Sequence, residues 1–233
     1  MTDLIFKAPL NSLSFGNVSF NLLKAMFKKG LRVGVFPMGN VEVSSFGIQE
    51  EGFKGWLEDG INNRFEKLSK DVPTLQMWHL NGSENRITGN QTLYTFYELD
   101  SPTDTEKILA QLQDNLIFSS SFAASHFKFE NTSFAPLGFD PDFKKTGKSY
   151  LQGKTHFGLM GKFEKRKHTA KIIKLWAKKY GNNYKYQLTC CVTNPFYKKE
   201  QMEQEISSTL EGKRYGNINF LPFLPQNAQV NDY

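Results

Sequence analysis

The stretch that decides the fold lies in the second half of the chain and reads Phe157-Gly158-Leu159-Met160-Gly161-Lys162-Phe163-Glu164-Lys165-Arg166-Lys167. Residues 155–160 predict a β-strand, Gly161 predicts a turn, and the apolar spacing of residues 169–180 predicts a helix. The first amide hydrogens of a helix have no partner within it, so a helix N-terminus attracts anions. The four cations of this stretch therefore predict a seat for a phosphate or diphosphate. A strand, turn and helix with a solvated basic rim is the alternative interpretation of the same residues.

The positive charge of the chain is concentrated around this stretch. The 233 residues carry a formal net charge of +6. Residues 144–185 hold thirteen Lys or Arg against one acid, Glu164, a net +12, so the remaining residues sum to −6. A positive segment in an otherwise acidic chain predicts an anionic ligand. Nucleic acid, a nucleotide-sugar diphosphate and an anionic membrane surface all fit this description.

The composition is typical of a folded intracellular protein. Hydrophobic residues make up 39% and aromatic residues 14% of the chain, which is enough for a packed core and argues against disorder. No apolar run reaches the ~18 residues that a membrane span needs, and residues 1–7 lack the pattern of a secretory signal. The only cysteines, Cys190 and Cys191, are neighbours on a predicted strand and point to opposite faces. We therefore expect a reduced, cytoplasmic protein.

Strands alternate with helices along the whole chain, which predicts an α/β protein with parallel sheets flanked by helices. Strands are expected over residues 4–8, 31–37, 74–80, 92–97, 116–119, 132–137, 155–160, 186–192 and 218–223. Helices are expected over residues 18–29, 46–70, 103–113, 121–127, 169–180 and 198–210, with Ser101 as a candidate cap of the third helix and Asn231 or Asp232 as a candidate cap of a last one. In the helix over residues 169–180, the inward residues are predicted to be Ile172, Ile173, Trp176 and Tyr180, and the outward residues Lys171, Lys174 and Lys178.

Several side chains fall near the carboxyl ends of predicted strands, where open α/β sheets bind ligands. These candidates are Phe15, Gly16 and Asn17 in the loop before the first helix, His79 and Asn81 after the third strand, and Tyr97 and Glu98 after the fourth. The loop holds one glycine only, so it is not a dinucleotide fingerprint. A structural role stays open for His79, as does a loop-capping role for Glu98.

The sequence predicts no metal site. The histidines are too scattered along the chain for a zinc site, and both cysteines sit together. The acids in Asp140-Pro141-Asp142 favour a plain turn, because proline separates them. The sequence holds neither a Gly-x-Ser-x-Gly elbow nor a Walker-type loop.

The order of four segments resembles that of the GT-B glycosyltransferases, specifically the large group called family 4. The segments are residues 11–18, Phe118-Ser119-Ser120-Ser121, Ala135-Pro136-Leu137-Gly138-Phe139-Asp140 and residues 161–167. They resemble, in order, the first loop of the family, its late strand and serine-led helix, its signature before the interdomain link, and its basic diphosphate-binding segment.

The resemblance implies transfer of a sugar from a nucleotide-diphosphate donor to an acceptor hydroxyl, without a metal or another cofactor. The donor diphosphate would be held by Gly161, Lys162, Arg166 and Lys167, with Lys162 and Lys167 foremost. The family often carries an active-site histidine where this chain has Tyr97 followed by Glu98, which makes Glu98 a candidate catalytic residue on the acceptor side. The acceptor could be a glycan, a lipid or a protein, and peripheral membrane contact stays open.

The resemblance also implies two Rossmann-like domains with a cleft between them. Residues 1–140 would form the N-terminal, acceptor-side domain, residues 141–154 a linker, and residues 155–233 part of the C-terminal, donor-side domain. The family continues through further strands and a glutamate motif that this sequence lacks, so the resemblance implies a truncated domain and puts activity in question.

Two other functions remain open. One is a nucleic-acid-binding module that uses the basic segment 144–185. Trp176 and Tyr180 lie on the inward stripe of the predicted helix, where they could not stack on bases, so no nucleic acid is expected. The other is a catalytically inactive protein that binds a sugar or nucleotide.

Overall fold

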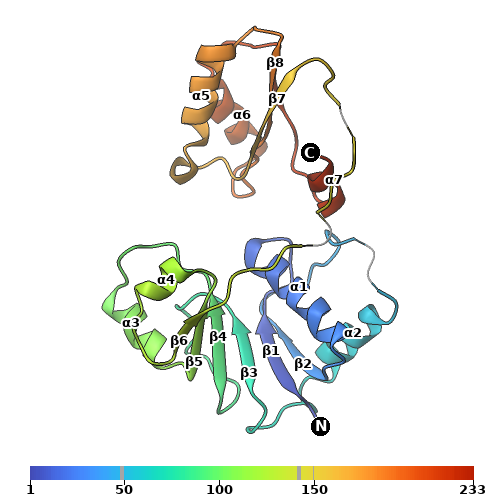
Figure 1. Ribbon diagram of the computed structural model, residues 1–233, viewed down its shortest axis with the longest axis vertical. Helices are drawn as coiled ribbons and strands as arrows, with labels where there is room; N and C mark the ends of the chain where they lie inside the picture. Colours follow the sequence, from blue (N-terminus) through green and yellow to red (C-terminus); the bar gives the residue numbers. More distant parts are fainter. Residues whose placement is uncertain (48–49, 141–142, 149) are drawn as a thin grey trace. The chain divides into compact units, whose positions relative to one another are not determined.

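The computed structural model describes residues 1–47, 50–140, 143–148 and 150–233 and divides the chain into two compact units, Met1–Pro141 and Asp142–Tyr233. Each unit is built on a sheet whose described strands pair in parallel, with helices packed against it (Figure 1). The predicted α/β fold with flanked parallel sheets is therefore confirmed.

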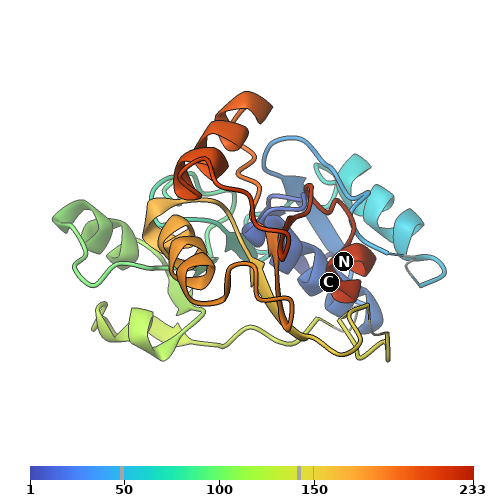
Figure 2. The ribbon, with the colours of Figure 1, turned by 90° about the horizontal axis from the view of Figure 1, so that it is seen from above.

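The first unit holds a six-stranded sheet in the order β2-β1-β3-β4-β5-β6. Its strands are β1 (Leu4–Ala8), β2 (Val33–Pro37), β3 (Thr74–Met77), β4 (Gln91–Thr95), β5 (Asn115–Phe118) and β6 (Thr132–Phe134). Its helices are α1 (Ser14–Lys28), α2 (Phe53–Asn62), α3 (Asp104–Gln111) and α4 (Ser121–Ser125). The first two helices lie towards the β1–β2 end of the sheet and the last two towards the β5–β6 end (Figure 1 and Figure 2).

Aromatic rings join α1 to α2 and to the segment before α2. Phe20 on α1 stacks on Phe46 with ring centroids 3.8 Å apart and meets Phe53 of α2 edge-on at 5.5 Å. All three side chains are buried. Burial of one such ring stabilises the fold by roughly 1.5–3 kcal/mol, so this cluster anchors the helix from which the candidate loop residues project.

A buried polar network holds the connection between β3 and β4. The Gln91 amide nitrogen donates to the Ser83 carbonyl at 2.9 Å and to the Gln113 side-chain oxygen at 2.8 Å. Gln113 in turn donates to the Ser83 hydroxyl at 3.1 Å. Because buried polar groups are costly when unpaired, this closed set of bonds fixes the segment that carries His79 and Asn81.

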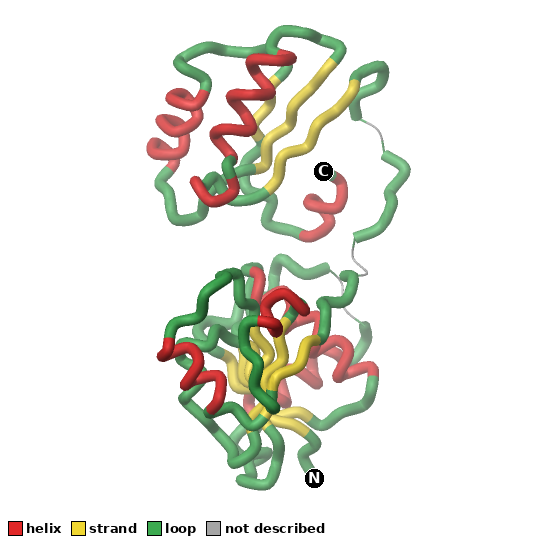
Figure 3. The backbone as a smooth tube through the Cα atoms, turned by 60° about the vertical axis from the view of Figure 1, so that its left-hand side comes forward, coloured by secondary structure: helices red, strands yellow, loops and turns green. Residues whose placement is uncertain are grey.

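The second unit holds a three-stranded sheet in the order β7-β8-β9. Its elements are β7 (Thr155–Met160), a 3-10 helix (Lys165–Lys167), α5 (Thr169–Tyr180), β8 (Tyr186–Cys191), α6 (Lys199–Thr209), β9 (Ile218–Phe220) and α7 (Asn227–Asp232). Figure 3 shows α5 and α6 on one face of this sheet and α7 on the other. Ile173 and Trp176 of α5 and Met202 of α6 pack on Leu188 and Cys190 of β8.

The opposite face of the second sheet is closed in part by Tyr233. Its hydroxyl accepts a hydrogen bond from the Leu159 amide at 2.8 Å and contacts the Thr189 carbonyl. Its ring lies over Gly158, where a Cβ atom would come within 3.3 Å of it. The bare glycine in β7 therefore makes room for this aromatic side chain.

Several details differ from the sequence-based expectations, among them the ends of some strands: β3 ends at Met77 rather than at residue 80. Within the range expected to be helical, residues 46–70, the structure has the helix α2. Gly52 has a left-handed backbone (φ 82), a conformation that does not fit inside an α-helix, so α2 starts after it. The cap of α3 is Thr103 rather than Ser101, in a reciprocal pair with Glu106. Asn231 and Asp232 lie inside or at the end of α7, which starts after Gln226. Ile172 was expected to face inward, but its side chain is 41% exposed, because the buried face of α5 is narrow and is occupied by neighbouring side chains.

Candidate functional site

The predicted anion seat lies at the carboxyl end of β7. Gly161 follows the strand directly, and its amide donates to the Cys191 carbonyl at 3.1 Å. Its φ of 133 is in the region that side chains rarely adopt. The turn therefore needs glycine at this position.

The basic cluster does not sit directly on a helix N-terminus, as the sequence analysis expected. A 3-10 helix over Lys165–Lys167 comes first, and His168 then takes a left-handed conformation (φ 53) before α5 begins at Thr169. The buried Thr169 hydroxyl donates to the Lys162 carbonyl at 3.2 Å. The start of α5 is thereby tied to the turn after β7, although it is separated from the turn along the chain.

Two of the three predicted donor cations flank Gly161. The Lys167 ammonium lies 3.4 Å from the point that a Cβ atom on Gly161 would occupy. Lys162 is half-buried, and its ammonium lies 5.1 Å from the centre of the Phe196 ring. The Arg166 guanidinium instead contacts the Glu164 carboxylate at 3.2 Å. The structure thus places the Lys167 ammonium beside Gly161, turns the Lys162 ammonium towards Phe196 and directs Arg166 towards an acid.

Asn194 supports this turn from the neighbouring strand, a role that the sequence analysis missed. Its buried side chain donates to the Phe163 carbonyl at 3.1 Å and accepts from the Phe196 amide at 3.1 Å. It therefore joins the segment after β8 to the segment after β7. The Asn-Pro pair after a predicted strand was the available signal, since it marks a turn at a ligand-binding edge. Phe196 itself is 75% exposed beside Lys162.

A cavity of about 330 Å³ lies on the other side of the basic cluster. Its lining includes the carboxylates of Glu164 and Glu205 together with Lys165, His168 and Lys171. Two acids at the mouth of α5 offset the attraction of the helix for anions. An anion is therefore better accommodated beside Gly161, Lys162 and Lys167 than in this cavity.

In the first unit, Phe15, Gly16 and Asn17 do not form a loop. They belong to the first turn of α1, which begins four residues earlier than expected. A Cβ atom on Gly16 would come within 2.3 to 2.5 Å of Asn11 atoms, so glycine lets residue 11 pack against the helix. Asn11 also accepts from the Leu13 amide at 3.0 Å, which shapes the entry into the helix.

Phe15 is the centre of an aromatic cluster at the carboxyl edge of the first sheet. Phe96 stacks on it with ring centroids 4.3 Å apart, and His79 meets it edge-on at 4.5 Å. Trp78 completes the cluster at 5.8 Å. The structure thus brings Phe15 and His79 together, and His79 remains exposed.

The other acceptor-side candidates are more dispersed. The Tyr97 hydroxyl donates to the Glu106 carboxylate at 3.2 Å, which belongs to the cap of α3. Burial, together with the charge of Glu106, raises the pKa of Tyr97 to about 12, so the phenol stays protonated at neutral pH. Asn81 and Glu98 are both exposed, but Glu98 follows Tyr97 directly whereas Asn81 belongs to the segment after β3.

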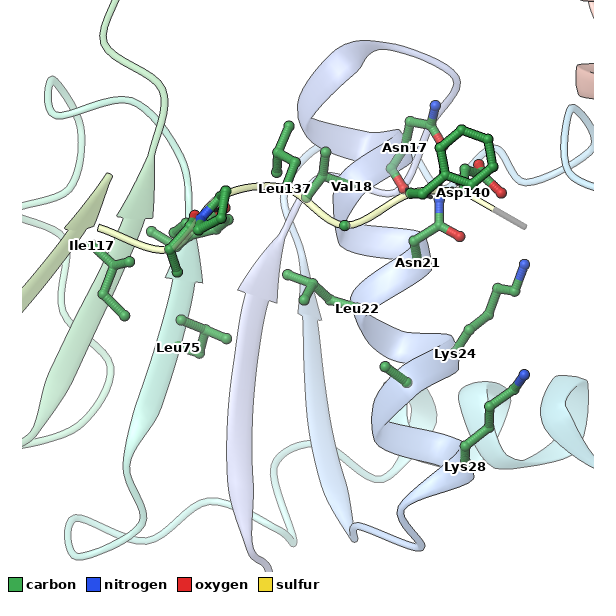
Figure 4. A pocket seen from close by; sticks show the side chains of 16 residues that line it. Asn17, Val18, Asn21, Leu22, Lys24, Lys28, Leu75, Ile117, Leu137 and Asp140 are labelled. Atoms are coloured by element: carbon green, nitrogen blue, oxygen red, sulfur yellow. Dashed lines mark hydrogen bonds between the residues drawn. The ribbon is translucent and has the colours of Figure 1, made fainter. Parts of the chain in front are cut away.

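A largely apolar groove of about 660 Å³ lies between α1 and the sheet (Figure 4). Leu22, Leu75 and Ile117 line it, and residues 135–140 cross it. Asn21 holds Asp140 through a hydrogen bond of 3.0 Å. The rest of the predicted Asp140-Pro141-Asp142 turn lies outside the described residues.

Two further searches concern metals and membranes. Among the residues that the structure describes, no three His, Cys, Asp or Glu side chains come together as a metal site would require. Across the same residues, every helix is too short or too polar to span a bilayer.

Comparison with known proteins gives a result for structure only. A scan against models of protein families finds no match, and a search of curated proteins finds none either. Solved structures do match. The chain is similar to MnaA of S. aureus, solved with UDP, at 12% identity and a TM-score of 0.58, covering 100% of this chain and 71% of that one.

Two other solved structures are similar over part of their length. An O-GlcNAc transferase of Thermobaculum terrenum matches at 12% identity with a TM-score of 0.51, covering 98% of this chain and 46% of that one. TarM of S. aureus, in complex with fondaparinux, α-GlcNAc-glycerol and UDP, matches at 13% identity and a TM-score of 0.46 over 67% of this chain. This chain spans 34% of the TarM chain. The likeness to MnaA and to the O-GlcNAc transferase confirms the predicted architecture: the chain has the GT-B glycosyltransferase fold.

Proposed function

We propose that the chain binds a nucleotide-diphosphate sugar and moves the sugar to an acceptor hydroxyl. The observation that carries the proposal is the turn after β7 at the carboxyl edge of a parallel sheet, where the Lys167 ammonium lies beside Gly161 and the next residue, Lys162, has its ammonium over the Phe196 ring. This edge is where open α/β sheets bind ligands. The GT-B fold supports the same assignment.

The chemistry of sugar transfer explains why cations belong here. The bond between the anomeric carbon and the diphosphate oxygen breaks, and negative charge develops on the leaving diphosphate. Preorganised ammonium groups stabilise that charge without any reorganisation at the moment of reaction. Lys162 and Lys167 supply this stabilisation in the proposal, and Gly161 lets the diphosphate approach the backbone. Arg166 contributes less, because Glu164 partly neutralises it. No metal is required for this arrangement.

The acceptor is proposed to meet the edge of the first sheet. Its hydroxyl oxygen forms the new bond to the sugar, and its proton passes to a base. Glu98 is the candidate base, and the exposed His79 and Asn81 are candidates for positioning the acceptor. Phe15 supports this edge by packing against His79.

Calorimetric titration of the whole chain with UDP, GDP and their sugar conjugates tests the donor site. Lys162→Ala combined with Lys167→Ala should weaken binding on the order of a hundredfold, since a charge-assisted hydrogen bond contributes roughly 1.5–3 kcal/mol. Lys178→Ala combined with Lys185→Ala removes the same charge from the same unit and should leave binding unchanged. Equal affinity of the two double variants would contradict the proposal.

Two further measurements separate the alternatives. Binding of a nucleotide sugar without release of free nucleotide, in the presence of glycan, lipid or peptide acceptors, would favour an inactive binding protein. The basic segment is the observation that favours nucleic acid, whose affinity would fall steeply with salt. Against it, Trp176 is only 7% exposed and cannot stack on bases.

A further inference from the structure

Helix α5 has two very different faces. Ile173, Trp176 and Ala177 face the sheet and are buried. The opposite side, named here the α5 lysine face, consists of Lys171, Ile172, Lys174, Leu175, Lys178 and Lys179, all of them exposed. The proposed donor site does not use these residues.

Two large aliphatic side chains stand among the lysines. Leu175 is 57% exposed and Ile172 is 41% exposed. Lys171 precedes Leu175 by four residues and Lys178 follows it by three, so both are its neighbours on the helix surface. Single exposed apolar residues are ordinary. Binding to a membrane surface increases with buried apolar area and with electrostatic attraction to anionic lipids, and this face offers both exposed aliphatic side chains and cations.

Along the chain the charge of this segment is of one sign, although Glu164 and Glu205 line the cavity beside Lys171. Residues 165–185 hold eight Lys or Arg and no Asp or Glu. Among the described residues, no ion pair joins Lys171, Lys174 or Lys178 to an acid. Solvated surfaces usually mix both signs, whereas clusters of four to eight cations on an amphipathic helix indicate anionic lipid.

We propose that the α5 lysine face docks on an anionic bilayer. The lysines contact lipid phosphates, and Leu175 and Ile172 enter the boundary between headgroups and acyl chains. Nucleic acid offers the same negative charge, but it engages aromatic side chains by stacking, and the aromatic residue at the middle of α5, Trp176, is buried. An aliphatic residue at the centre of the face gains free energy when it enters the boundary between headgroups and acyl chains.

Co-sedimentation of the whole chain with vesicles tests the electrostatic part. The chain should bind vesicles of phosphatidylcholine mixed with phosphatidylglycerol and not vesicles of phosphatidylcholine alone. Lys171→Gln with Lys174→Gln and Lys178→Gln should weaken binding on the order of a hundredfold, because each lysine near an anionic surface contributes about fivefold. Lys54→Gln with Lys107→Gln and Lys128→Gln is the matched control with equal charge in the first unit. Equal loss in both triple variants would overturn the proposal.

A second pair of variants tests the apolar part with all charges kept. Leu175→Ser combined with Ile172→Ser should lower vesicle affinity by about tenfold. Leu112→Ser, at a side chain that is 55% exposed on the first unit, should leave it unchanged. Circular dichroism verifies that both variants are folded. If the serine pair binds vesicles like the unmodified chain, or if the chain binds a single-stranded oligonucleotide and ignores anionic vesicles, the membrane proposal is wrong.

Discussion

The ammonium group of Lys167 lies 3.4 Å from the point that a Cβ atom on Gly161 would occupy. The 3-10 helix that ends at Lys167 turns the chain back, so a cation that follows the glycine in sequence returns to it in space. Gly161 itself adopts a φ of 133, which a residue with a side chain rarely does.

Gly161→Ala should weaken UDP binding, because a side chain strains the turn at a φ of 133. We expect at least a tenfold loss in calorimetric affinity, from a backbone cost of about 1–3 kcal/mol. Gly153→Ala is a suitable control, since Gly153 also has positive φ (74) and a Cβ there meets no described atom within 4 Å. Unchanged UDP affinity in Gly161→Ala would count against a diphosphate at this turn.

Asn194→Ala should destabilise the second unit. The substitution leaves the Phe163 carbonyl and the Phe196 amide without their side-chain partner, and an unsatisfied buried group costs roughly 1–3 kcal/mol. Urea unfolding followed by fluorescence measures the change. Asn219→Ala, at an exposed position in β9, should shift the midpoint little. If both variants unfold alike, Asn194 does not hold the two segments together.

Gly16→Ala should destabilise the first unit, because its Cβ would come within 2.5 Å or less of Asn11 atoms, two of them in the backbone. Overpacking of this kind costs roughly 1–3 kcal/mol. Gly55→Ala, inside α2 with open space around its Cβ, should instead be neutral or stabilise by about 0.5–1 kcal/mol. Thermal unfolding of the two variants should therefore move in different directions.

Tyr97→Phe should change how the free energy of unfolding depends on pH under alkaline conditions. The pKa of Tyr97 is raised from 10.0 to about 12 by burial and by Glu106. Between these two values the unfolded chain has lost the phenolic proton and the folded chain still holds it. The free energy of unfolding therefore falls as pH rises through this window.

The phenylalanine variant lacks the titrating phenol, so its free energy of unfolding should fall less between pH 10 and 12. Urea unfolding of both proteins at several pH values measures the difference between their free energies of unfolding. The other tyrosines are the same in both proteins, so their contribution cancels in this difference. Curves that stay parallel across the window would show that Tyr97 does not titrate as its surroundings imply.

Local patterns predicted most of the fold, because the elements concerned have strong periodicity. The helix over residues 169–180 agrees with α5 in both of its bounds, and its buried residues recur at helical spacing. The strand after the polar stretch, residues 155–160, coincides with β7. The bounds of elements with competing local signals were predicted less well. Four glycines lie within the long helix expected over residues 46–70, and α2 covers only Phe53–Asn62.

The site was predicted only in part, for a physical reason. Lys162, Lys167 and Gly161 come from one short segment, so a local pattern sufficed to group them. The support from Asn194 reaches Phe163 across 31 residues of chain, and no short pattern reports such a contact. The first turn of α1 was expected to be a loop, because the packing of Gly16 on Asn11 shows only in three dimensions.

The hydrogen bond from Thr169 to the Lys162 carbonyl ties the start of the lysine-rich helix to the glycine turn. The two proposed binding sites are therefore joined by a direct contact, through which binding at one could affect the other. Lipid composition would then act as a tuning parameter for nucleotide affinity, and Thr169→Val would uncouple the two while preserving each.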